Sequence, residues 1–576
     1  MKTFVRAISL TATLAIAGCG GGGGSSATPS AVRDGTALQS VTVTVAVPKR
    51  PSGALKLPNY VSPSTQSMTV AVTQTNAPNI TPATVPCTST CTATVSVAPG
   101  PATFTVTLYK GPQGTGAALS TGTLATTIVR NALNTVNLTF DPVVANFGIT
   151  FGNPNSGPGG APVPLLVIGQ PATLANVFRV VDAGANQLVG PGSFVDPKGN
   201  PLTFTFTNTA SAHAHVSASQ LSAPGPVAVA YDGHGVNDTI SVSDGLNVAQ
   251  GSYFSSLPQE QPVNASHSVW PVVMTIGGDG NVWFTDGNGA VVHRHNADGT
   301  FSAFPISGTS NGSINSNTLV TGGDGTVWIS YDRSIARLST AGVVTAFPLP
   351  RPTFPYGVSA MTRDADGGIA FLSGDGQVGH AALDGTITRL GSVGSSSFGL
   401  GNFMLGPDKR LWLADTSNFN APTLVAFGNG VATRYPVPAQ PNNLLAGPDG
   451  NLWAPFSSGG RFVKYDTSGN VVSNVAMPAF PAGVFTAATS ANAIVDAKGT
   501  IYFSDGSAVI GTGSTGAIGR IDTAGNIAEY PIYPLSLYAG AIILSPDGRL
   551  YWGDEPSFGG FGTVGGGLGS VDATLL

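Results

Sequence analysis

Gly447-Pro448-Asp449-Gly450-Asn451-Leu452-Trp453 decides the fold of the C-terminal half of this chain, because close variants of it recur six more times. Most copies join a glycine-containing turn to a short apolar run with Trp or Tyr. The other copies lie at 278–283, 323–328, 366–369, 407–412, 498–502 and 546–551. Anchor positions 279, 324, 366, 408, 449, 498 and 547 are 45, 42, 42, 41, 49 and 49 residues apart. A period of about 40–50 residues is typical of β-propeller blades.

Each repeat is expected to form four antiparallel strands. The Asp-Gly pair between two apolar runs predicts a hairpin with a two-residue primed turn, because Gly adopts positive φ freely. An aromatic-centred strand follows, as at 282–285, then a third strand, as at 291–294. The fourth ends in an aromatic-Pro pair such as 304–305, which suits an edge strand that need not donate hydrogen bonds. Seven such repeats predict a seven-bladed β-propeller over residues 251–576.

The last repeat lacks an outer strand after 569–572. The segment 252–258, Ser-Tyr-Phe-Ser-Ser-Leu-Pro, resembles a fourth strand. We expect it to pair with the last blade and close the ring, which removes an exposed sheet edge. The alternative is an interdomain linker and a loose C-terminus.

The N-terminus predicts export. A basic start, Met1 to Arg6, precedes an apolar run, Ala7 to Ala17, which is too short to span a bilayer and is typical of a signal peptide. The small residues directly before Cys19 resemble the lipobox of bacterial lipoproteins. That resemblance implies a signal peptide at 1–18, a lipidated Cys19 that anchors the protein to the cell envelope, and a Gly/Ser-rich tether at 19–38. Gly20 instead of Asp points to the outer membrane. A secretory signal with an incidental Cys is the alternative.

Composition agrees with an exported protein. Charged residues make up 9% of the chain and the net charge is −5, so nucleic acid is not an implied partner and the membrane is one only through the lipid anchor. Cys87 and Cys91 flank a three-residue loop between expected strands. This spacing predicts a disulfide within a hairpin, formed in an oxidising compartment. A CxxxC metal half-site would need further His or Cys ligands, and none is near in sequence.

Two further β regions precede the propeller. Residues 39–145 alternate apolar and polar side chains over short runs, including 41–45, 68–72, 92–95, 103–109 and 136–140. This pattern predicts a β-sandwich of the immunoglobulin-like or transthyretin-like kind. A Gly/Pro/Asn-rich stretch at 152–162 marks a boundary, and residues 146–250 are expected to form a second β-sandwich. The predicted fold class is therefore all-β.

The repeat resembles the streptogramin lyase (virginiamycin B lyase) family and its NHL-like relatives over residues 251–576, through phrases such as Trp283-Phe284-Thr285-Asp286 and Ile518-Gly519-Arg520-Ile521-Asp522. The resemblance implies a metal-dependent C–O lyase. In that family, histidines near the start of innermost strands carry the elimination, and a Glu after the Trp strand helps to hold Mg²⁺. The innermost strands here are expected to begin around Val272, Asn317, Asn402, Asn442 and Asn492, none of which is His.

Acidic residues at the ends of the second strands are the main candidate site. They are expected to gather around the channel, where their oxygens could hold Mg²⁺ or Ca²⁺; alternatively they cap turns through backbone N–H groups. This set is Asp286, Asp415, Asp505, Asp554 and Glu555. A polar mouth suited to a sugar or peptide is expected from Tyr356, Asn402, Asn442 and Asn492. The histidine pairs 213/215 and 293/295 are expected to face solvent, and His267 is the one His expected near this face.

Two functions remain open from the sequence. In the first, the propeller is a binding module for a small-molecule, glycan or protein ligand and does not turn it over. In the second, it is a streptogramin-lyase-like lyase or a hydrolase that acts at the acidic residues. The acidic positions carry Asp where the resemblance implies Glu, and an exposed Asp with a pKa near 4 is a poor general base at neutral pH.

Overall fold

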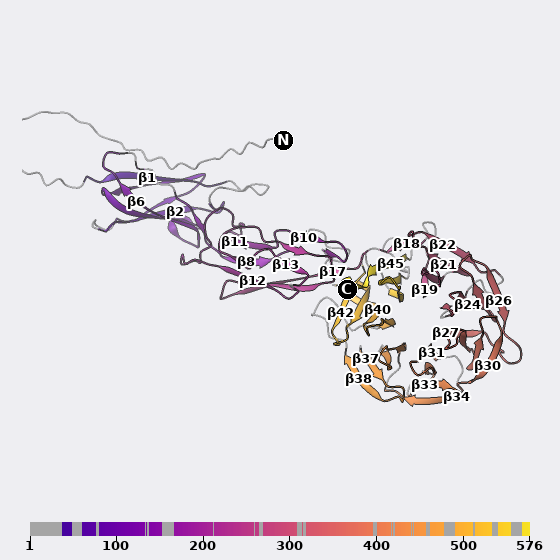
Figure 1. Ribbon diagram of the computed structural model, residues 1–576. Helices are drawn as coiled ribbons and strands as arrows, with labels where there is room; N and C mark the ends of the chain where they lie inside the picture. Colours follow the sequence, from indigo (N-terminus) through magenta and orange to yellow (C-terminus); the bar gives the residue numbers. More distant parts are fainter. Residues whose placement is uncertain are drawn as a thin grey trace, which may run out of the picture. The chain divides into compact units, whose positions relative to one another are not determined.

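In the part of the chain that the computed structural model describes, the regular elements are almost all β-strands (Figure 1). Within the residues it describes, no helix is long and apolar enough to cross a membrane. The chain divides into two compact units, one of residues 1–152, 173–231 and 237–253 and one of residues 153–172, 232–236 and 254–576. The described residues are 37–48, 60–75, 80–132, 134, 138–151, 166–210, 212–258, 260–263, 269–287, 289–307, 314, 318–394, 400–415, 417–418, 421–438, 441, 443–456, 461–476, 490–510, 513–532, 539–554 and 567–576.

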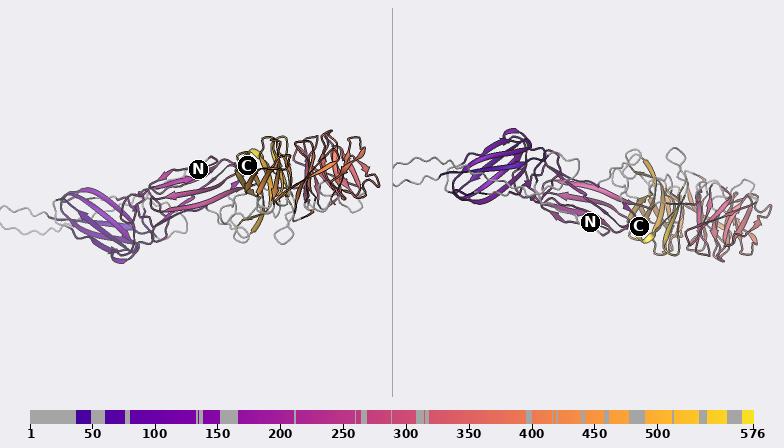
Figure 2. Two further views of the ribbon diagram at one scale, coloured as in Figure 1. Left: turned by 90° about the horizontal axis from the view of Figure 1, so that it is seen from below. Right: turned by 90° about the horizontal axis from the view of Figure 1, so that it is seen from above.

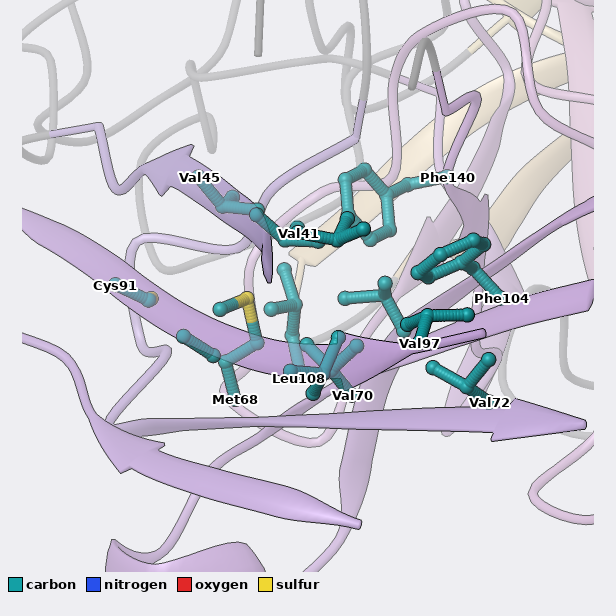
Figure 3. Packing of buried hydrophobic residues seen from close by; sticks show 14 of the residues in the cluster. Val41, Val45, Met68, Val70, Val72, Cys91, Val97, Phe104, Leu108 and Phe140 are labelled. Atoms are coloured by element: carbon teal, nitrogen blue, oxygen red, sulfur yellow. The ribbon is translucent and has the colours of Figure 1, made fainter. Parts of the chain in front are cut away.

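The first β region has a two-stranded sheet, β1-β4, and a five-stranded sheet, β3-β2-β5-β6-β7. Side chains alternate between core and solvent along its strands, so that one face of each sheet is apolar. Val41, Met68 and Phe104 are fully buried in the shared core, which Figure 3 shows from close by. The elements are β1 (Gln39–Ala46), β2 (Ser67–Thr73), β3 (Ala83–Pro86), β4 (Thr90–Val97), β5 (Gly100–Tyr109), η1 (Pro112–Gly114), β6 (Ala118–Ile128) and β7 (Asp141–Pro142).

The disulfide between Cys87 and Cys91 is confirmed, but its setting differs from the prediction. The two cysteines do not close a hairpin, because β3 belongs to the five-stranded sheet and β4 to the two-stranded sheet. The bridge therefore fastens the short crossover between the two sheets. Cys91 is fully buried in the core that both sheets share. The expected strand at 136–140 is wrong where it is described, since 138–140 carry no strand although Phe140 is buried.

The second β region is centred on packed phenylalanines. The ring of Phe204 lies 4.8 Å from Phe147, 5.0 Å from Phe178 and 5.2 Å from Phe194, each edge to face, an arrangement that aromatic quadrupoles favour. Its sheets are β10-β15-β13, β11-β8 and β14-β12-β16-β17-β9. The strands are β8 (Asn146–Ile149), β9 (Leu166–Val167), β10 (Ala172–Leu174), β11 (Phe178–Val181), β12 (Phe204–Asn208), β13 (Ala214–Val216), β14 (Gln220–Leu221), β15 (Val229–Tyr231), β16 (Asn237–Ser243) and β17 (Val248–Ser256).

The propeller contains seven four-stranded antiparallel sheets among the described residues. They are arranged as a ring in Figure 1, and Figure 2 shows the ring from its edge. The innermost strands are β19 (Pro271–Ile276), β23 (Val320–Thr321), β27 (Val358–Arg363), β31 (Leu400–Leu405), β35 (Leu445–Ala446), β39 (Ser490–Val495) and β43 (Ala539–Leu544). The second strands are β20 (Val282–Asp286), β24 (Val327–Tyr331), β28 (Ile369–Ser373), β32 (Leu411–Asp415), β36 (Leu452–Phe456), β40 (Ile501–Ile510) and β44 (Arg549–Asp554).

The third and fourth strands complete each sheet. The third strands are β21 (Val291–His295), β25 (Ser334–Leu338), β29 (Gln377–Ala381), β33 (Thr423–Gly428), β37 (Arg461–Tyr465), β41 (Gly513–Ile521) and β45 (Gly567–Asp572), and η3 (Ala573–Leu575) follows the last. The fourth strands are β22 (Phe301–Pro305), β26 (Val344–Pro348), β30 (Ile387–Ser392), β34 (Val431–Pro436), β38 (Val471–Ala476), β42 (Ile527–Pro531) and, in the last sheet, β18 (Gln261–Pro262). Each innermost strand contacts the next, and β43 contacts β19, so the ring is closed.

The ring closes through a different segment from the one predicted. β18 pairs with β45 as the outer strand of the last sheet, with Gln261 opposite Leu568. Glu260 accepts a hydrogen bond from the indole N–H of Trp552 at 2.9 Å. The predicted closing segment, 252–258, lies instead mainly in β17. Its buried Tyr253 donates to Asp238 of β16 and so packs outside the last sheet. The chain joins the last sheet only a few residues later, at Gln261.

The Asp-Gly turns also differ from the prediction. In the first sheet, the amide of Gly280 donates to Gly277 at 2.9 Å and the amide of Gly277 donates to Asn281 at 3.0 Å. Gly280 has a φ of 76°, whereas the φ of Asp279 is not positive. This is the three-residue hairpin with a left-handed Gly, since a two-residue type I′ turn needs two positive φ angles. Asn429 and Gly430, at 53° and 78°, do form that primed turn between β33 and β34.

Candidate functional sites of the propeller

The propeller has two chemically different faces. The turn face carries the turns that join each innermost strand to its second strand. The acidic face is the other end, where innermost strands begin and second strands end. Pairing puts Asp286 opposite Pro271, Asp415 opposite Leu400, Asp505 opposite Ser490 and Asp554 opposite Ala539. The four aspartates therefore hold equivalent register positions in four sheets.

Asp286 is buried at the end of β20. One carboxylate oxygen accepts the backbone amide of Trp270 at 3.2 Å, and the other lies 4.0 Å from Nε2 of His293. His293 was expected to face solvent, and that expectation is wrong, because the ring is buried and stacks on Phe284 at 5.3 Å. The pair has the residue types of an acid–base site, but both members lie inside the sheet rather than at an open surface.

Asp415 is also buried and is held by three donors. The amide and hydroxyl of Ser417 donate to one oxygen at 3.1 and 2.6 Å, and Arg434 donates to the other at 2.5 Å. Arg434 also reaches the carbonyl of Val393 at 2.7 Å and so links the fourth sheet to the third. Among the described residues, neither Asp415 nor Asp286 belongs to a group of three metal-ligating side chains within 4.8 Å of one another.

The other predicted site residues are described to different extents. Asn492 is partly buried and donates to the carbonyl of Gly540 at 3.3 Å, which ties adjacent sheets together. Tyr356 is 59% exposed just before β27. Only the backbone is described for Asp505, Asp554 and Asn402, and Cys19, His267, Asn317, Asn442 and Glu555 lie outside the described residues.

The turn face repeats one structural motif with small variations. In the first sheet, the indole of Trp283 donates to Asp279 at 3.1 Å, and Arg294 lies over the Trp ring at 5.2 Å and 3.4 Å from the same carboxylate. Asp279 thus accepts from the indole and pairs with Arg294, and Arg294 makes a cation–π contact with the Trp283 ring. Arg294 also donates to the carbonyl of Thr340 in the next sheet at 2.8 Å. The motif therefore joins neighbouring sheets.

The fourth sheet builds the same motif from a different position. Trp412 donates to Asp408 at 3.0 Å, as in the first sheet. The third-strand position that faces it is Ala426, and the cation comes instead from the turn. Arg410 lies 2.5 Å from Asp408 and 4.9 Å from the Trp412 ring centre. Burial raises the pKa of Asp408, but the hydrogen bonds from Trp412 and Arg410 outweigh it and hold the pKa below its usual range.

The third sheet departs from this motif at four positions. Ala370 replaces the Trp, and His380 replaces the Arg that faces it. Asp364 stands at the first turn position, where the first sheet has Gly277, and Gly368 stands where the first sheet has Asn281. Nε2 of His380 lies 3.0 Å from Asp366 and 3.9 Å from Asp364. This group was not predicted from the sequence; an alignment of the third strands on the residue that pairs with each Trp shows it.

An open depression of about 610 Å³, called the cavity below, lies at the turn-face end of four innermost strands. Its walls are mostly apolar and come from β27, β31, β35 and β39. Two charged residues, Arg363 and Asp364, belong to its lining. The lining residues are Thr362, Arg363, Asp364, Ala365, Met404, Leu405, Leu444, Leu445, Ala446, Ile494 and Val495. The described cavity therefore lies at the opposite end of the strands from the predicted acidic site.

Comparison with known proteins supports the predicted resemblance. The fold and its repeated turns define a β-propeller protein. Virginiamycin B lyase from Nocardia farcinica (strain IFM 10152) is 32% identical over 115 residues, which are 19% of this chain and 38% of the lyase. The propeller is thus streptogramin lyase-like in sequence, although the match spans well under half of that relative. No protein-family model matches the chain.

Solved structures of similar proteins include two of virginiamycin B lyase from Staphylococcus aureus. The selenomethionine-substituted enzyme is 22% identical, with a TM-score of 0.41, over 49% of this chain and 91% of the lyase chain. The catalytically inactive enzyme with quinupristin is 21% identical, with a TM-score of 0.44, over 54% of this chain and 97% of the lyase chain.

Proposed function

We propose that this protein is an exported, lipid-anchored binding protein whose propeller holds a small apolar molecule at the turn face. The cavity of about 610 Å³ supports this proposal most directly, because ligand pockets of about 300–1,000 Å³ combine apolar walls with a few polar groups. Met404, Leu445 and Ile494 supply apolar wall, and Arg363 and Asp364 supply the polar groups. A ligand with an apolar body and one polar or charged group fits this lining.

The two described carboxylates of the acidic face argue for binding without turnover. A lyase needs a base that can reach its substrate and carboxylates that are free to hold a metal. Asp286 and Asp415 are buried and accept hydrogen bonds from the protein itself. Among the described strands, the innermost ones begin with Pro271, Val320, Val358, Leu400, Leu445, Ser490 and Ala539. None of these is a histidine.

The binding proposal is tested with 1-anilinonaphthalene-8-sulfonate, a fluorescent probe with an aromatic body and one anionic group. We expect saturable binding of one probe per chain, because the cavity offers apolar walls beside Arg363. Leu445→Glu should weaken binding at least tenfold by placing a carboxylate in the wall. Tyr356→Glu adds the same charge at an exposed position just before β27 and should leave binding unchanged.

Two results would contradict the binding proposal. One is equal probe binding in the Leu445→Glu and Tyr356→Glu proteins. The other is loss of binding in both. Circular dichroism and thermal melts of each variant separate loss of the cavity from loss of the fold.

The lipid anchor is tested by Cys19→Ala in cells that process lipoproteins. We expect the unaltered protein to partition into the detergent phase of Triton X-114 and to label with a palmitate analogue. The Cys19→Ala protein should enter the aqueous phase without label, because one acyl-bearing residue is the proposed membrane contact. Detergent partitioning that is unaffected by the substitution would rule the anchor out.

A further inference from the structure

We propose that Asp364, Asp366 and His380 bind a divalent metal ion, zinc, at the turn face of the third sheet. One nitrogen and two carboxylate groups offer ligand atoms that all lie within 4.8 Å of one another. Imidazole and carboxylate together suit zinc, whereas oxygen-only sets suit magnesium and calcium. This proposal does not rest on the binding proposal above.

The spacing of the three side chains fits one metal ion. A tetrahedral zinc ion with bonds of about 2.1 Å holds its ligand atoms about 3.4 Å apart. Nε2 of His380 lies 3.0 Å from Oδ2 of Asp366 and 3.9 Å from Oδ2 of Asp364. Small side-chain movements would bring both distances to that value. Three protein ligands leave a further coordination position for water or another ligand.

The loop places two of the ligands through its own backbone. Oδ1 of Asp364 accepts the amide of Ala365 at 2.7 Å, and Oδ1 of Asp366 accepts the amide of Gly368 at 2.8 Å. Oδ2 of each aspartate lies toward His380, and Oδ1 of Asp366 also lies 3.2 Å from Nε2 of His380. A Cβ at position 368 would lie 2.5 Å from Nε2 of His380. Glycine at position 368 therefore leaves room for the imidazole of His380. The Asn, Thr or Arg that other sheets carry at this turn position would crowd it.

Charge balance separates this group from the motif of the other sheets. In the first sheet, Arg294 neutralises Asp279 and Gly277 brings no charge. In the third sheet, two carboxylates face one imidazole, and no Lys or Arg of the described chain forms an ion pair with either. The group thus carries up to two negative charges where its counterpart is neutral. A bound dication would restore neutrality.

The side chains are accessible enough to exchange an ion. The exposed fractions are 13% for His380, 20% for Asp364 and 63% for Asp366. Asp364 also belongs to the lining of the cavity. A metal bound here would therefore lie at the cavity rim, on the opposite face from the aspartates that the sequence proposed as metal ligands.

Titration of the metal-free full-length protein with Zn²⁺ and with Co²⁺ tests the site. The titration uses a His234→Asn background, since His234 lies 3.0 Å from Asp232 and could contribute a second signal. We expect one zinc per chain, a rise in melting temperature, and visible d–d absorption with Co²⁺. Mg²⁺ at equal concentration should neither raise the melting temperature nor compete.

His380→Arg and Asp364→Gly are the decisive variants, because each installs the residue of a sister sheet and should fold. His380→Arg should abolish the Co²⁺ spectrum, and Asp364→Gly should weaken zinc binding at least tenfold. Arg337→His is the matched control: it places a His beside Asp324 in the second sheet, where Gly322 stands in place of Asp364, and should add no zinc site. Unchanged zinc stoichiometry and affinity in His380→Arg, or no zinc binding by the unaltered chain, would overturn the proposal.

Discussion

The two faces of the propeller differ in how closely they follow the repeat. On the turn face, an aspartate meets an indole and a cation in the first and fourth sheets, even though the cation comes from Arg294 in one and Arg410 in the other. On the acidic face, the equivalent second-strand position is Asp in four sheets and Tyr, Ser or Phe in the other three. In chain order it is Asp286, Tyr331, Ser373, Asp415, Phe456, Asp505 and Asp554.

This difference helps to distinguish residues that stabilise the fold from residues that are candidates for a function. The first and fourth sheets make the same contacts between Asp, Trp and Arg although the Arg comes from different positions, which indicates that the motif serves the fold. Arg294, Arg337 and Arg410 each also reach a carbonyl of the next sheet, so the turn face helps to hold the ring together. The third sheet lacks the Trp and Arg of this motif. Its Asp364 and His380 are therefore better candidates for a function than the aspartates of the acidic face.

The largest expected effect comes from breaking the turn-face motif. Trp412 is fully buried, stacks on Tyr435 at 5.5 Å and donates to Asp408. Trp412→Ala should lower the free energy of unfolding by about 3–5 kcal/mol through lost burial and a residual cavity. Chemical denaturation of the propeller measures it. Tyr356→Ala, at an exposed position, should change stability by less than about 0.5 kcal/mol, and equal effects of the two would refute the distinction.

Acid should weaken the turn face through its aspartates. The pKa values of Asp279, Asp408 and Asp449 lie below the usual range, since hydrogen bonds and cations outweigh the opposing effect of burial. A lowered folded-state pKa gives stability that is present above the unfolded value of about 3.9 and is lost as the pH falls through the folded values. The denaturant concentration at the unfolding midpoint should thus decrease when the pH is lowered below about 4. Asp408→Asn should make that fall shallower, and an unchanged pH profile would contradict its role.

A smaller effect is expected from the acidic face. Asp415→Ala removes the acceptor for Ser417 and Arg434. Since Arg434 is more than a third exposed, solvent compensates for part of the loss, and we expect destabilisation of about 1 kcal/mol. Thermal melts at pH 7 measure it. A loss as large as that of Trp412→Ala would show that this face is as essential to the fold as the turn face.

The smallest effect sharpens the comparison among the turns. Lys409 has φ of 62° at the turn position that Gly450 fills in the fifth sheet. A left-handed non-glycine residue costs about 1–2 kcal/mol, of which the greater flexibility of unfolded glycine offsets about half. Lys409→Gly should therefore stabilise the propeller by about 0.5 kcal/mol, and Gly450→Lys should destabilise it similarly. Effects of the opposite sign would show that the Lys409 side chain makes a compensating contact.

Much of the fold could be predicted from the sequence because the repeat is local. Each turn, aromatic strand and edge proline is encoded within one period, so strand order and the equivalence of Asp286 with Asp415 follow from the alignment of the copies. The closing strand could not be predicted in this way. Tyr253 and Gln261 are both near the first repeat, and only packing of Tyr253 against Asp238 decides which segment is left for the last sheet.

The candidate sites were harder to predict, because burial and pairing across strands decide them. The sequence shows that Asp286 ends a second strand, but it does not show that Trp270 and His293 enclose it. His380 lies 14 residues after Asp366, and only the hairpin pairing of β28 with β29 brings the two together.

The most direct test of binding without turnover is a lyase assay with virginiamycin B and Mg²⁺. Mass spectrometry of the reaction separates the intact ring from the linear product, with a known virginiamycin B lyase as positive control. We predict no linear product above the protein-free rate, since Asp286 and Asp415 are buried and hydrogen-bonded to the protein. Linear product that forms with the unaltered chain and is lost in Asp286→Asn or Asp415→Asn would contradict this proposal.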